Sequence, residues 1–214
     1  MDQKKLDQQS QHWEASFSSK PEMFGHEPSL AAVKSLNFFK NKNIVELGAG
    51  LGRDTIFFAQ NSIHVEVLDY SQKAIETINN KSKKLNLEQF IKTKVFDVRK
   101  KLPFEDNTID ACFSHMLYCM ALSNSDLKNL NKEISRILKP GGINIYTVRH
   151  TDDGDYKNGI HIGEDLYEND GFIVHFFSKD KINQLSKDFE ILNIEKFEEG
   201  NFPRKLFKVT AKKK

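Results

Sequence analysis

The stretch Asn43-Ile44-Val45-Glu46-Leu47-Gly48-Ala49-Gly50-Leu51-Gly52-Arg53-Asp54 decides the fold of this 214-residue chain. It begins with a short apolar run at residues 44–47, bounded by polar residues, which predicts a buried strand. Three glycines then alternate at positions 48, 50 and 52, and a helical pattern follows from Thr55. Strand, glycine turn and helix in this order form a nucleotide-binding crevice, in which a ligand approaches the backbone so closely that a Cβ would collide with it.

The spacing of the glycines separates this turn from two other phosphate-binding turns. A dinucleotide fingerprint would place its third small residue at position 53, where this chain has Arg53. The P-loop pattern G-x-x-x-x-G-K-[ST] does not occur in the sequence. The strand also carries a carboxylate, Glu46, which favours a ligand with an amino group over a pyrophosphate. The sequence therefore predicts a positively charged nucleoside as the ligand, and an NAD-dependent enzyme is an alternative that Glu46 and Arg53 disfavour.

These residues resemble the first motif of the class I S-adenosylmethionine-dependent methyltransferases, E/D-x-G-x-G-x-G, which stands here as Glu46-Leu47-Gly48-Ala49-Gly50-Leu51-Gly52. The resemblance implies an α/β chain with a three-layer Rossmann-like methyltransferase fold, whose seven-stranded sheet is mostly parallel and has an antiparallel last strand. It also implies S-adenosylmethionine as the cofactor, bound at Glu46, Gly48, Ala49, Gly50, Gly52 and Arg53. A glycine turn that only links a strand to a helix is the alternative.

A second carboxylate follows the next predicted strand. Apolar and polar residues alternate over residues 63–67, and the strand ends at Asp69. A carboxylate about 20 residues beyond the glycine turn is where ribose hydroxyls are held. Tyr70 and Ser71 come next, and Ser71 is expected to cap a helix over residues 72–85. We therefore expect Asp69, Tyr70 and Ser71 at the cofactor, with a purely structural Asp69 as the alternative.

The third and fourth predicted strands add further cofactor residues. The third, over residues 91–96, ends at Asp97, and the resemblance implies that an acidic residue here meets the adenine amino group, next to Val98. A surface-turn aspartate is the alternative. The loop Leu102-Pro103-Phe104-Glu105-Asp106-Asn107-Thr108-Ile109-Asp110 matches the family pattern before its fourth strand. That strand, over residues 109–114, brings Ser114 to the cofactor side.

Four side chains are candidates for a catalytic base. Ligands of open α/β sheets bind at the carboxyl ends of the strands, and His115 and Tyr118 follow the fourth strand. His150 follows a fifth strand predicted at residues 143–148, and His175 lies further on. A base is needed only if the acceptor carries a proton, so a thiol, amine or metalloid acceptor would need none. A structural histidine is the alternative, and no residues have the spacing of a metal site.

The rest of the chain is expected to flank this core. We expect one domain over 1–214, divided into an N-terminal helical lid segment (1–42), the cofactor-binding core (43–149), a substrate-side insert (150–177) and a C-terminal helix with two strands (178–214). Residues 1–20 predict a loosely attached helix with Trp13 and Phe17 on one face. Within the insert, residues 151–171 predict an irregular segment and residues 172–177 a short apolar strand. Residues 200–203 predict the turn between the last two strands.

Composition narrows the functional class. The net charge of +2 is too small to indicate nucleic acid as a partner. Cys112 and Cys119 are expected to be buried free thiols. The absence of a signal peptide and of an apolar run of about 18 residues favours the cytoplasm and disfavours a membrane. Oligomeric state, monomer or homodimer, is left open by the sequence.

The predicted function is methyl transfer from S-adenosylmethionine to a small-molecule acceptor by in-line displacement. The segment Phe24-Gly25-His26-Glu27-Pro28-Ser29 is similar to that of small-molecule methyltransferases of the tellurite-resistance group, which implies a small acceptor. The alternatives are a nucleic-acid or protein methyltransferase and a non-catalytic protein that binds S-adenosylmethionine.

Overall fold

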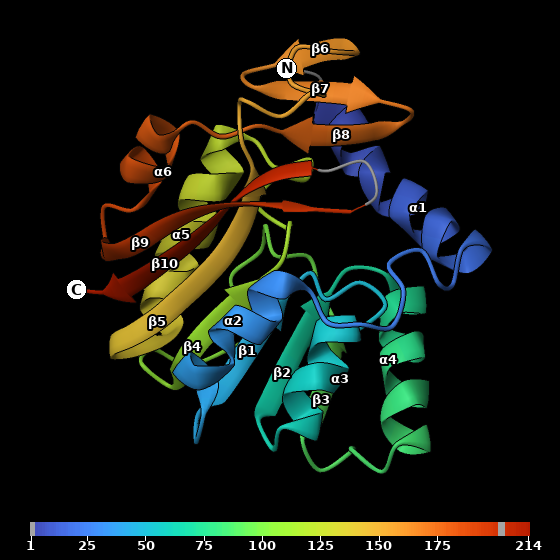
Figure 1. Cartoon of the computed structure of the whole chain (residues 1–214), viewed down its shortest axis with the longest axis vertical. Coiled ribbons are helices and arrows are strands. Elements are labelled where there is room, and N and C mark those ends of the chain that lie inside the picture. Colours follow the sequence, from blue (N-terminus) through green and yellow to red (C-terminus); the bar gives the residue numbers. More distant parts are fainter. Residues whose placement is uncertain (1–2, 201–203) are drawn as a thin grey trace.

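A seven-stranded sheet organises the computed structural model, which describes residues 3–200 and 204–214. Its spatial order is β3 (Ile91–Val95), β2 (His64–Asp69), β1 (Asn43–Leu47), β4 (Ile109–Ser114), β5 (Leu138–Arg149), β10 (Arg204–Lys213) and β9 (Phe189–Glu199) (Figure 1). The first five strands pair in parallel, and β10 runs antiparallel to both of its neighbours. The predicted fold, with its antiparallel last strand, is confirmed.

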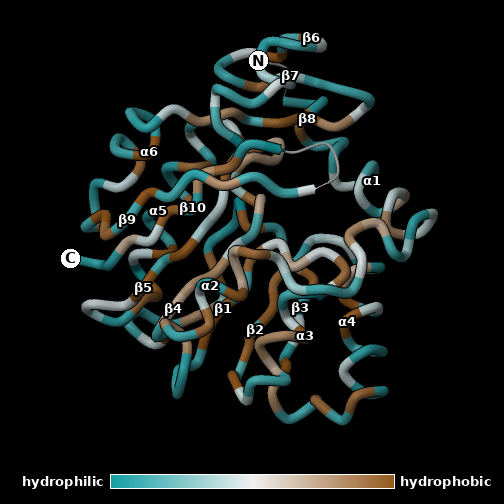
Figure 2. The backbone as a smooth tube through the Cα atoms, in the orientation of Figure 1, coloured by the Kyte–Doolittle hydropathy of each residue, from teal (hydrophilic) through white to brown (hydrophobic). Residues whose placement is uncertain are grey.

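Helices cover both faces of this sheet and make three layers. One face carries α2 (Leu30–Phe39), α3 (Arg53–Gln60) and α4 (Gln72–Lys84), and the other carries α5 (Asn124–Ile137) and α6 (Lys179–Leu185) (Figure 1). Successive side chains of a strand point to opposite faces, so each face has its own core. Phe39, Phe58 and Phe113 meet edge to face in one core, and Tyr118 stacks on Tyr146 in the other. Figure 2 shows hydrophobic residues concentrated along the central strands.

Side-chain caps fix where the helices begin. Ser71 accepts a hydrogen bond from the backbone N–H of Ala74 at the start of α4, and Ser178 caps α6 in the same way. The cap at Ser71 was predicted from the sequence and is confirmed. At the start of α3, the cap residue is Gly52, with φ +80°. The glycine turn therefore passes directly into α3, as the strand–turn–helix pattern predicts.

One predicted boundary needs correction. The fifth strand was expected to begin at residue 143, but β5 begins at Leu138, and residues 139–142 interrupt its pairing between Ile109↔Leu138 and Ala111↔Ile143. The Pro-Gly-Gly segment therefore interrupts the register of a strand that has already begun. Of the turn predicted at residues 200–203, residues 201–203 lie outside the described residues.

The insert after β5 is more regular than predicted. It contains a three-stranded antiparallel sheet made of β6 (Ile160–Gly163), β7 (Leu166–Asn169) and β8 (Phe172–His175). A two-residue turn of Asp170 and Gly171, both at positive φ, joins β7 to β8. Asp-Gly is a strong signal for this kind of hairpin. The strand predicted at residues 172–177 is present as β8, whereas the irregular segment predicted at residues 151–171 contains β6 and β7. Together they form a small sheet that stands beyond the end of the main sheet (Figure 1).

The N-terminal helix α1 (Gln3–Ser19) is firmly attached, contrary to the loose attachment predicted. It lies between α4 and β8 (Figure 1). Its Leu6 packs with Leu166 and Ile173 of the small sheet, and its Phe17 packs with Leu51 beside the glycine turn. The sequence signal for α1 was faint because its apolar residues are few. Within the described residues, no helix is long and apolar enough to cross a bilayer.

Candidate functional site

Two buried carboxyl groups flank the glycine turn between β1 and α3. Glu46, on β1, is 2% exposed and accepts a hydrogen bond of 2.5 Å from the Thr55 hydroxyl. Burial, and then the nearby Asp54, raise its pKa to about 8. Asp69, at the end of β2, is 6% exposed, and burial raises its pKa to about 6 although two backbone N–H groups lower it. The turn therefore lies between two carboxyl groups with raised pKa values, and each of them takes up a proton more readily than an exposed carboxyl group does.

The carboxylate of Asp69 organises the loops around it. Its Oδ2 accepts the backbone N–H of Gly50 at 2.9 Å, and its Oδ1 accepts the backbone N–H of Ser71 at 2.9 Å. The glycine turn and the start of α4 are thus fixed relative to each other by one side chain. Each carboxylate oxygen keeps a second lone pair with which it can accept a further hydrogen bond.

Asp97, the residue predicted to meet an adenine, is already paired. Arg99 donates to both of its oxygens, with Nη2 2.7 Å from Asp97 Oδ2. The pKa of Asp97 is lowered overall, because these hydrogen bonds outweigh the rise caused by burial. Arg99 also donates to Asp7 of α1 at 2.5 Å, and Val98 is buried beside it. The loop after β3 is therefore connected to the N-terminal helix.

Glu14 connects the middle of α1 to the start of α4. Its carboxylate accepts a hydrogen bond of 2.5 Å from the Ser71 hydroxyl and one of 3.0 Å from the backbone N–H of Lys73. A carboxylate at the N-terminus of a helix is stabilised by the helix dipole. Together with the contact of Asp7, this places α1 across the loops that follow β2 and β3.

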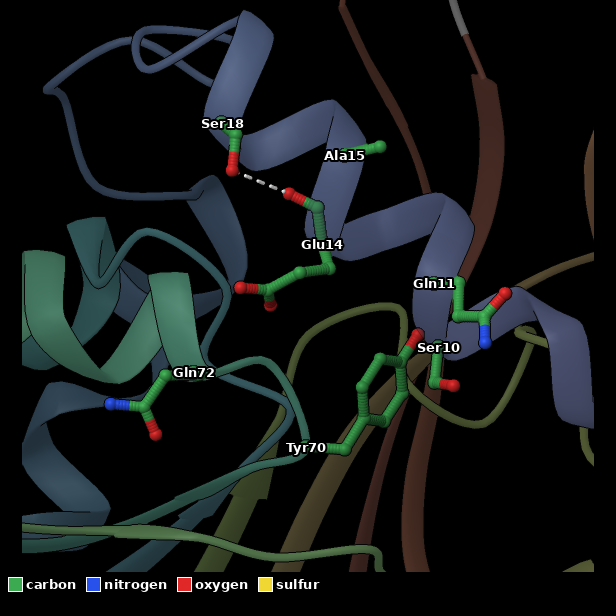
Figure 3. A pocket seen from close by; sticks show the side chains of 7 residues that line it. All are labelled: Ser10, Gln11, Glu14, Ala15, Ser18, Tyr70 and Gln72. Carbon is green, nitrogen blue, oxygen red and sulfur yellow. Dashed lines mark hydrogen bonds between the residues drawn. The ribbon is translucent and has the colours of Figure 1, made fainter.

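A groove of about 550 Å³ separates α1 from the loop that follows Asp69. Its lining residues are Ser10, Gln11, Glu14, Ala15, Ser18, Tyr70 and Gln72. Figure 3 shows the Tyr70 ring pointing from the loop toward α1, near Ser10. The volume is in the range of small-molecule sites, and Tyr70 is one of the cofactor residues predicted from the sequence.

Aromatic side chains cover the glycine turn. A Cβ added to Gly50 would lie 3.6 Å from the Phe17 ring and 3.8 Å from the Phe24 ring. Trp13 stands next to both of these rings and contacts Phe172 of β8, with a centroid distance of 4.9 Å. The N-terminal segment and the insert, which are far apart in sequence, therefore meet above the turn.

His115 follows β4 and belongs to a chain of polar contacts. Its Nδ1 is 3.0 Å from the Thr147 hydroxyl, which accepts the backbone N–H of Met116 at 2.8 Å. Its Nε2 is 3.4 Å from Glu199 Oε2, and Arg53 donates to Glu199 Oε1 at 2.6 Å. This chain connects the end of β4, the end of β9 and the start of α3.

The other three candidates for a base are buried. Tyr118 is fully buried, its hydroxyl bonds to Asn131 and Asn144, and burial raises its pKa well above its usual value. His175 is fully buried between the Leu122 carbonyl and the Lys181 ammonium, and burial lowers its pKa to about 4. These placements correct the expectation that Tyr118 and His175 face an acceptor, because their polar atoms already have partners in the core.

His150 and Ser114 are also buried, with different surroundings. The His150 ring packs against Phe207, its Nδ1 accepts the backbone N–H of Asp152, and burial lowers its pKa. The Ser114 hydroxyl is buried and has no hydrogen-bond partner among the described residues. A buried hydroxyl without a partner is costly, so Ser114 has a polar group to offer a ligand.

Sequence reasoning missed several residues of this region: Asp7, Glu14, Arg99, Thr147 and Glu199. None of them belongs to a motif, and each acts through a partner distant in sequence. Glu199 stands in the run Glu195–Glu199 among other charged residues, where nothing distinguishes it. One weak signal was its position two residues after Phe197, which places both side chains on the same face of a strand. In the structure Glu199 is partly buried, whereas its neighbour Glu198 is exposed.

Comparison with known proteins matches one segment of the chain to a family of domains. A methyltransferase domain model matches residues 44–142. The chain is similar to phosphoethanolamine N-methyltransferase 1 of Triticum aestivum, with 34% identity over 118 residues, 54% of this chain and 22% of that protein. It is also similar to the tRNA N(3)-cytidine methyltransferase METTL2 of Bos taurus, with 27% identity over 157 residues, 66% of this chain and 40% of that protein. The chain thus spans only about a fifth to two fifths of these relatives.

A solved structure extends the likeness over nearly the whole chain. The 1,6-didemethyltoxoflavin-N1-methyltransferase of Burkholderia thailandensis, with bound 1,6-didemethyltoxoflavin and S-adenosylhomocysteine, covers 95% of this chain and 86% of its own, with a TM-score of 0.75 and 14% identity. This likeness concerns the fold. The sequence match confirms the family predicted from the first motif and, with it, S-adenosylmethionine as the cofactor. Residues 44–142 therefore form a methyltransferase domain of the class I S-adenosylmethionine-dependent family.

Proposed function

We propose that this chain transfers the methyl group of S-adenosylmethionine to a small-molecule acceptor. The observation that carries the proposal is the position of the two buried carboxyl groups, Glu46 and Asp69, on either side of the glycine turn. The turn follows β1, whose neighbours β2 and β4 lie on opposite sides, so it stands at the point where the strand order reverses. Ligands of open α/β sheets bind at such points.

The residues around the turn fit this cofactor. Glu46 offers a carboxyl group to a cationic amino group, and Asp69 offers lone pairs to ribose hydroxyls. The unpartnered Ser114 hydroxyl and the groove beside Tyr70 supply further polar and aromatic contacts. When bound, the cofactor supplies an activated methyl group on a sulfonium. The task of the protein is then to align the acceptor at about 3–3.5 Å and to exclude water.

Two features support a small acceptor. The helix α1 and the sheet β6–β8 meet above the glycine turn and cover it. Gln9 of α1 donates to the Gly171 carbonyl at 2.9 Å and accepts the backbone N–H of Ile173 at 3.2 Å, so the two segments are directly joined. Two of the similar proteins act on small molecules by name, phosphoethanolamine and 1,6-didemethyltoxoflavin. The third acts on tRNA, which makes a tRNA methyltransferase the competing proposal.

A turnover screen tests the proposal. The chain would be incubated with S-adenosylmethionine and thiols, amines, phenols, metalloid anions or a bulk tRNA pool, and S-adenosylhomocysteine would be quantified. Turnover with one small-molecule class supports the proposal. Turnover with tRNA alone would show that the chain is a tRNA methyltransferase instead. Binding of S-adenosylhomocysteine without turnover on any acceptor would favour a non-catalytic binding protein.

Cofactor binding is expected to release a proton from Glu46 at pH 7. The pKa of about 8 means that this carboxyl group is mostly protonated at pH 7, and a cationic amino group would favour its ionised form. Because its folded pKa lies above the unfolded value of 4.5, the folded state binds more protons between those two values. The free energy of unfolding of the cofactor-free chain should therefore fall as pH rises through that window.

Calorimetry with S-adenosylhomocysteine in buffers of different ionisation enthalpy would count the released protons. Affinity should rise roughly 50-fold between pH 6 and pH 8 if only the ionised carboxylate binds, by the arithmetic of one pKa near 8. Glu46→Gln should lose this part of the proton release and of the pH dependence, whereas the exposed Glu105→Gln should keep both. Equal proton release by Glu46→Gln and the wild type would show that Glu46 does not contact the cofactor.

A further inference from the structure

One carboxylate, that of Glu199, joins the acceptor side of the site to the cofactor side. Glu199 is the last residue of β9, and its two oxygens face different partners. Oε1 accepts a hydrogen bond of 2.6 Å from Arg53, the residue directly after the glycine turn. Oε2 lies 3.4 Å from Nε2 of His115, the residue directly after β4. Three elements that are distant in sequence thus depend on one side chain.

The charge on Glu199 is well defined. Burial raises its pKa, but His115 and Arg53 together lower it to about 2. Glu199 is therefore ionised at neutral pH, and an ionised carboxylate only accepts hydrogen bonds. It follows that His115 Nε2 carries a hydrogen whenever it contacts Glu199.

The other ring nitrogen of His115 is fixed by Thr147. The Thr147 hydroxyl uses one lone pair to accept the backbone N–H of Met116. Its own hydrogen remains available for Nδ1 of His115, 3.0 Å away. A neutral ring with a hydrogen on Nε2 must accept at Nδ1, and Thr147 can donate there. In this tautomer of the neutral ring, Nδ1 accepts from Thr147 and the hydrogen on Nε2 faces the Glu199 carboxylate at ion-pair distance, where Oε2 has no hydrogen-bond partner among the described residues.

We propose that Glu199 is a positioning residue, which selects the Nε2-protonated form of His115 and holds Arg53 against the start of α3. In this arrangement neither nitrogen of neutral His115 is free to take a proton from an acceptor. His115 then keeps one fixed ring orientation beside the acceptor instead of acting as a general base. The effect on methyl transfer rests on the proposed function, whereas the tautomer of His115 does not.

The tautomer is measured by nitrogen-15 NMR of the imidazole ring. The chain has seven histidines, so the signals of His115 are assigned by their loss in His115→Gln. The wild type should show the Nε2-protonated form of the neutral ring. Glu199→Gln should show a mixture of both tautomers, because an amide both donates and accepts. Glu198→Gln is the matched control, since Glu198 is exposed and precedes Glu199 on the same strand, and it should leave the ring signals unchanged.

Kinetics with an acceptor found in the turnover screen supply the second readout. Glu199→Gln should lower kcat/KM by roughly tenfold or more, because a misplaced orienting group is costly in rate. Its affinity for S-adenosylhomocysteine should fall by less than kcat/KM does, since Glu199 reaches the cofactor side only through Arg53. Glu199→Asp keeps the charge and should keep the Nε2-protonated form, with partial recovery of kcat/KM.

The outcomes separate this inference from the proposed function. A wild-type ring protonated on Nδ1, or ring signals that are identical in Glu199→Gln, would overturn the role of Glu199. Failure of the wild type to methylate any acceptor would overturn the proposed function, while the ring signals would still test the contact. An amide spectrum of Glu199→Gln that matches the wild type elsewhere shows that the variant is folded, and Glu199→Asp provides the test if it is not.

Discussion

Replacement of Gly50 by valine is expected to abolish binding of S-adenosylhomocysteine while the chain stays folded. Gly50 has φ +54°, and an added Cβ would meet Phe17 and Phe24 only at ordinary contact distances of 3.6 Å and more. The substitution therefore fits the protein but fills the space in which a ligand would reach the backbone. We expect the dissociation constant to rise more than about 100-fold, which corresponds to roughly 2.7 kcal/mol.

The cost to stability should be modest by comparison. A residue with a side chain at positive φ costs about 1–2 kcal/mol, which lowers the melting temperature of a chain of this size by roughly 2–8 °C. Calorimetric titration and thermal unfolding on the same sample separate the two effects. Normal cofactor binding by Gly50→Val would mean that the crevice lies elsewhere.

Gly52→Ala is the informative comparison within the same turn. A Cβ at Gly52 would lie 2.4 Å from Cγ1 of Ile78 on α4, at φ +80°. This substitution should therefore lower stability strongly, through a clash between α3 and α4. Gly48 is intermediate, because its Cβ would lie 2.9 Å from the flexible Leu117 side chain. Substitutions at the three glycines of this motif are thus expected to impair the protein for different reasons.

The parts of this site that are local in sequence could be predicted. The strand, the glycine turn and the helix at residues 43–54 follow from a short apolar run and three glycines, and Asp69 follows from its distance to that turn. Ser71 was predicted as a cap because a hydroxyl before a helical pattern has few other roles. Each of these inferences needs only neighbours in the chain or a fixed spacing.

The contacts that join distant segments could not be predicted in the same way. Glu14 reaches Ser71, Asp7 reaches Arg99, and Glu199 reaches His115, and in each pair the sequence gives no period or spacing that relates the two. Acidic residues on exposed helices and strands are common, so the residue type alone does not identify these three as functional. Their roles depend on how the sheet brings separate loops to the same edge.

Two predictions from the sequence were wrong for other reasons. The Asp170-Gly171 dipeptide between alternating segments is a hairpin signal that was present in the sequence, and its neglect made the insert look irregular. Tyr118 was placed at the acceptor because of its position after β4. The chain turns inward there, with Met116 at φ +62°, and Tyr118 packs against Tyr146. A single residue at positive φ redirects the following side chains, and pattern reasoning does not detect it.

Removal of residues 1–20 is expected to lower methyl transfer about 100-fold, the order of loss seen when reactants are misaligned. The two main cores contain no residue of α1, so the sheet should still fold. Without α1, Phe17 no longer covers Gly50 and the small sheet β6–β8 loses its partner. Water would then enter the site and the acceptor would be held less well. Cofactor affinity should fall by less than about tenfold, since Glu46 and Asp69 remain.

Two point variants test, without truncation, whether α1 covers the site. Glu14→Gln removes a charge that accepts hydrogen bonds from Ser71 and Lys73 at the start of α4, and hydrogen bonds to charged groups contribute about 1.5–3 kcal/mol. Asp7→Asn removes a charge on the same helix, but its ion pair with Arg99 is on the surface, where such pairs contribute little. Hydrogen exchange of α1 should therefore speed up by roughly tenfold or more in Glu14→Gln, and much less in Asp7→Asn. Methyl transfer should follow the same order. Full activity of the truncated chain, or equal hydrogen exchange of α1 in both variants, would show that α1 does not cover the site.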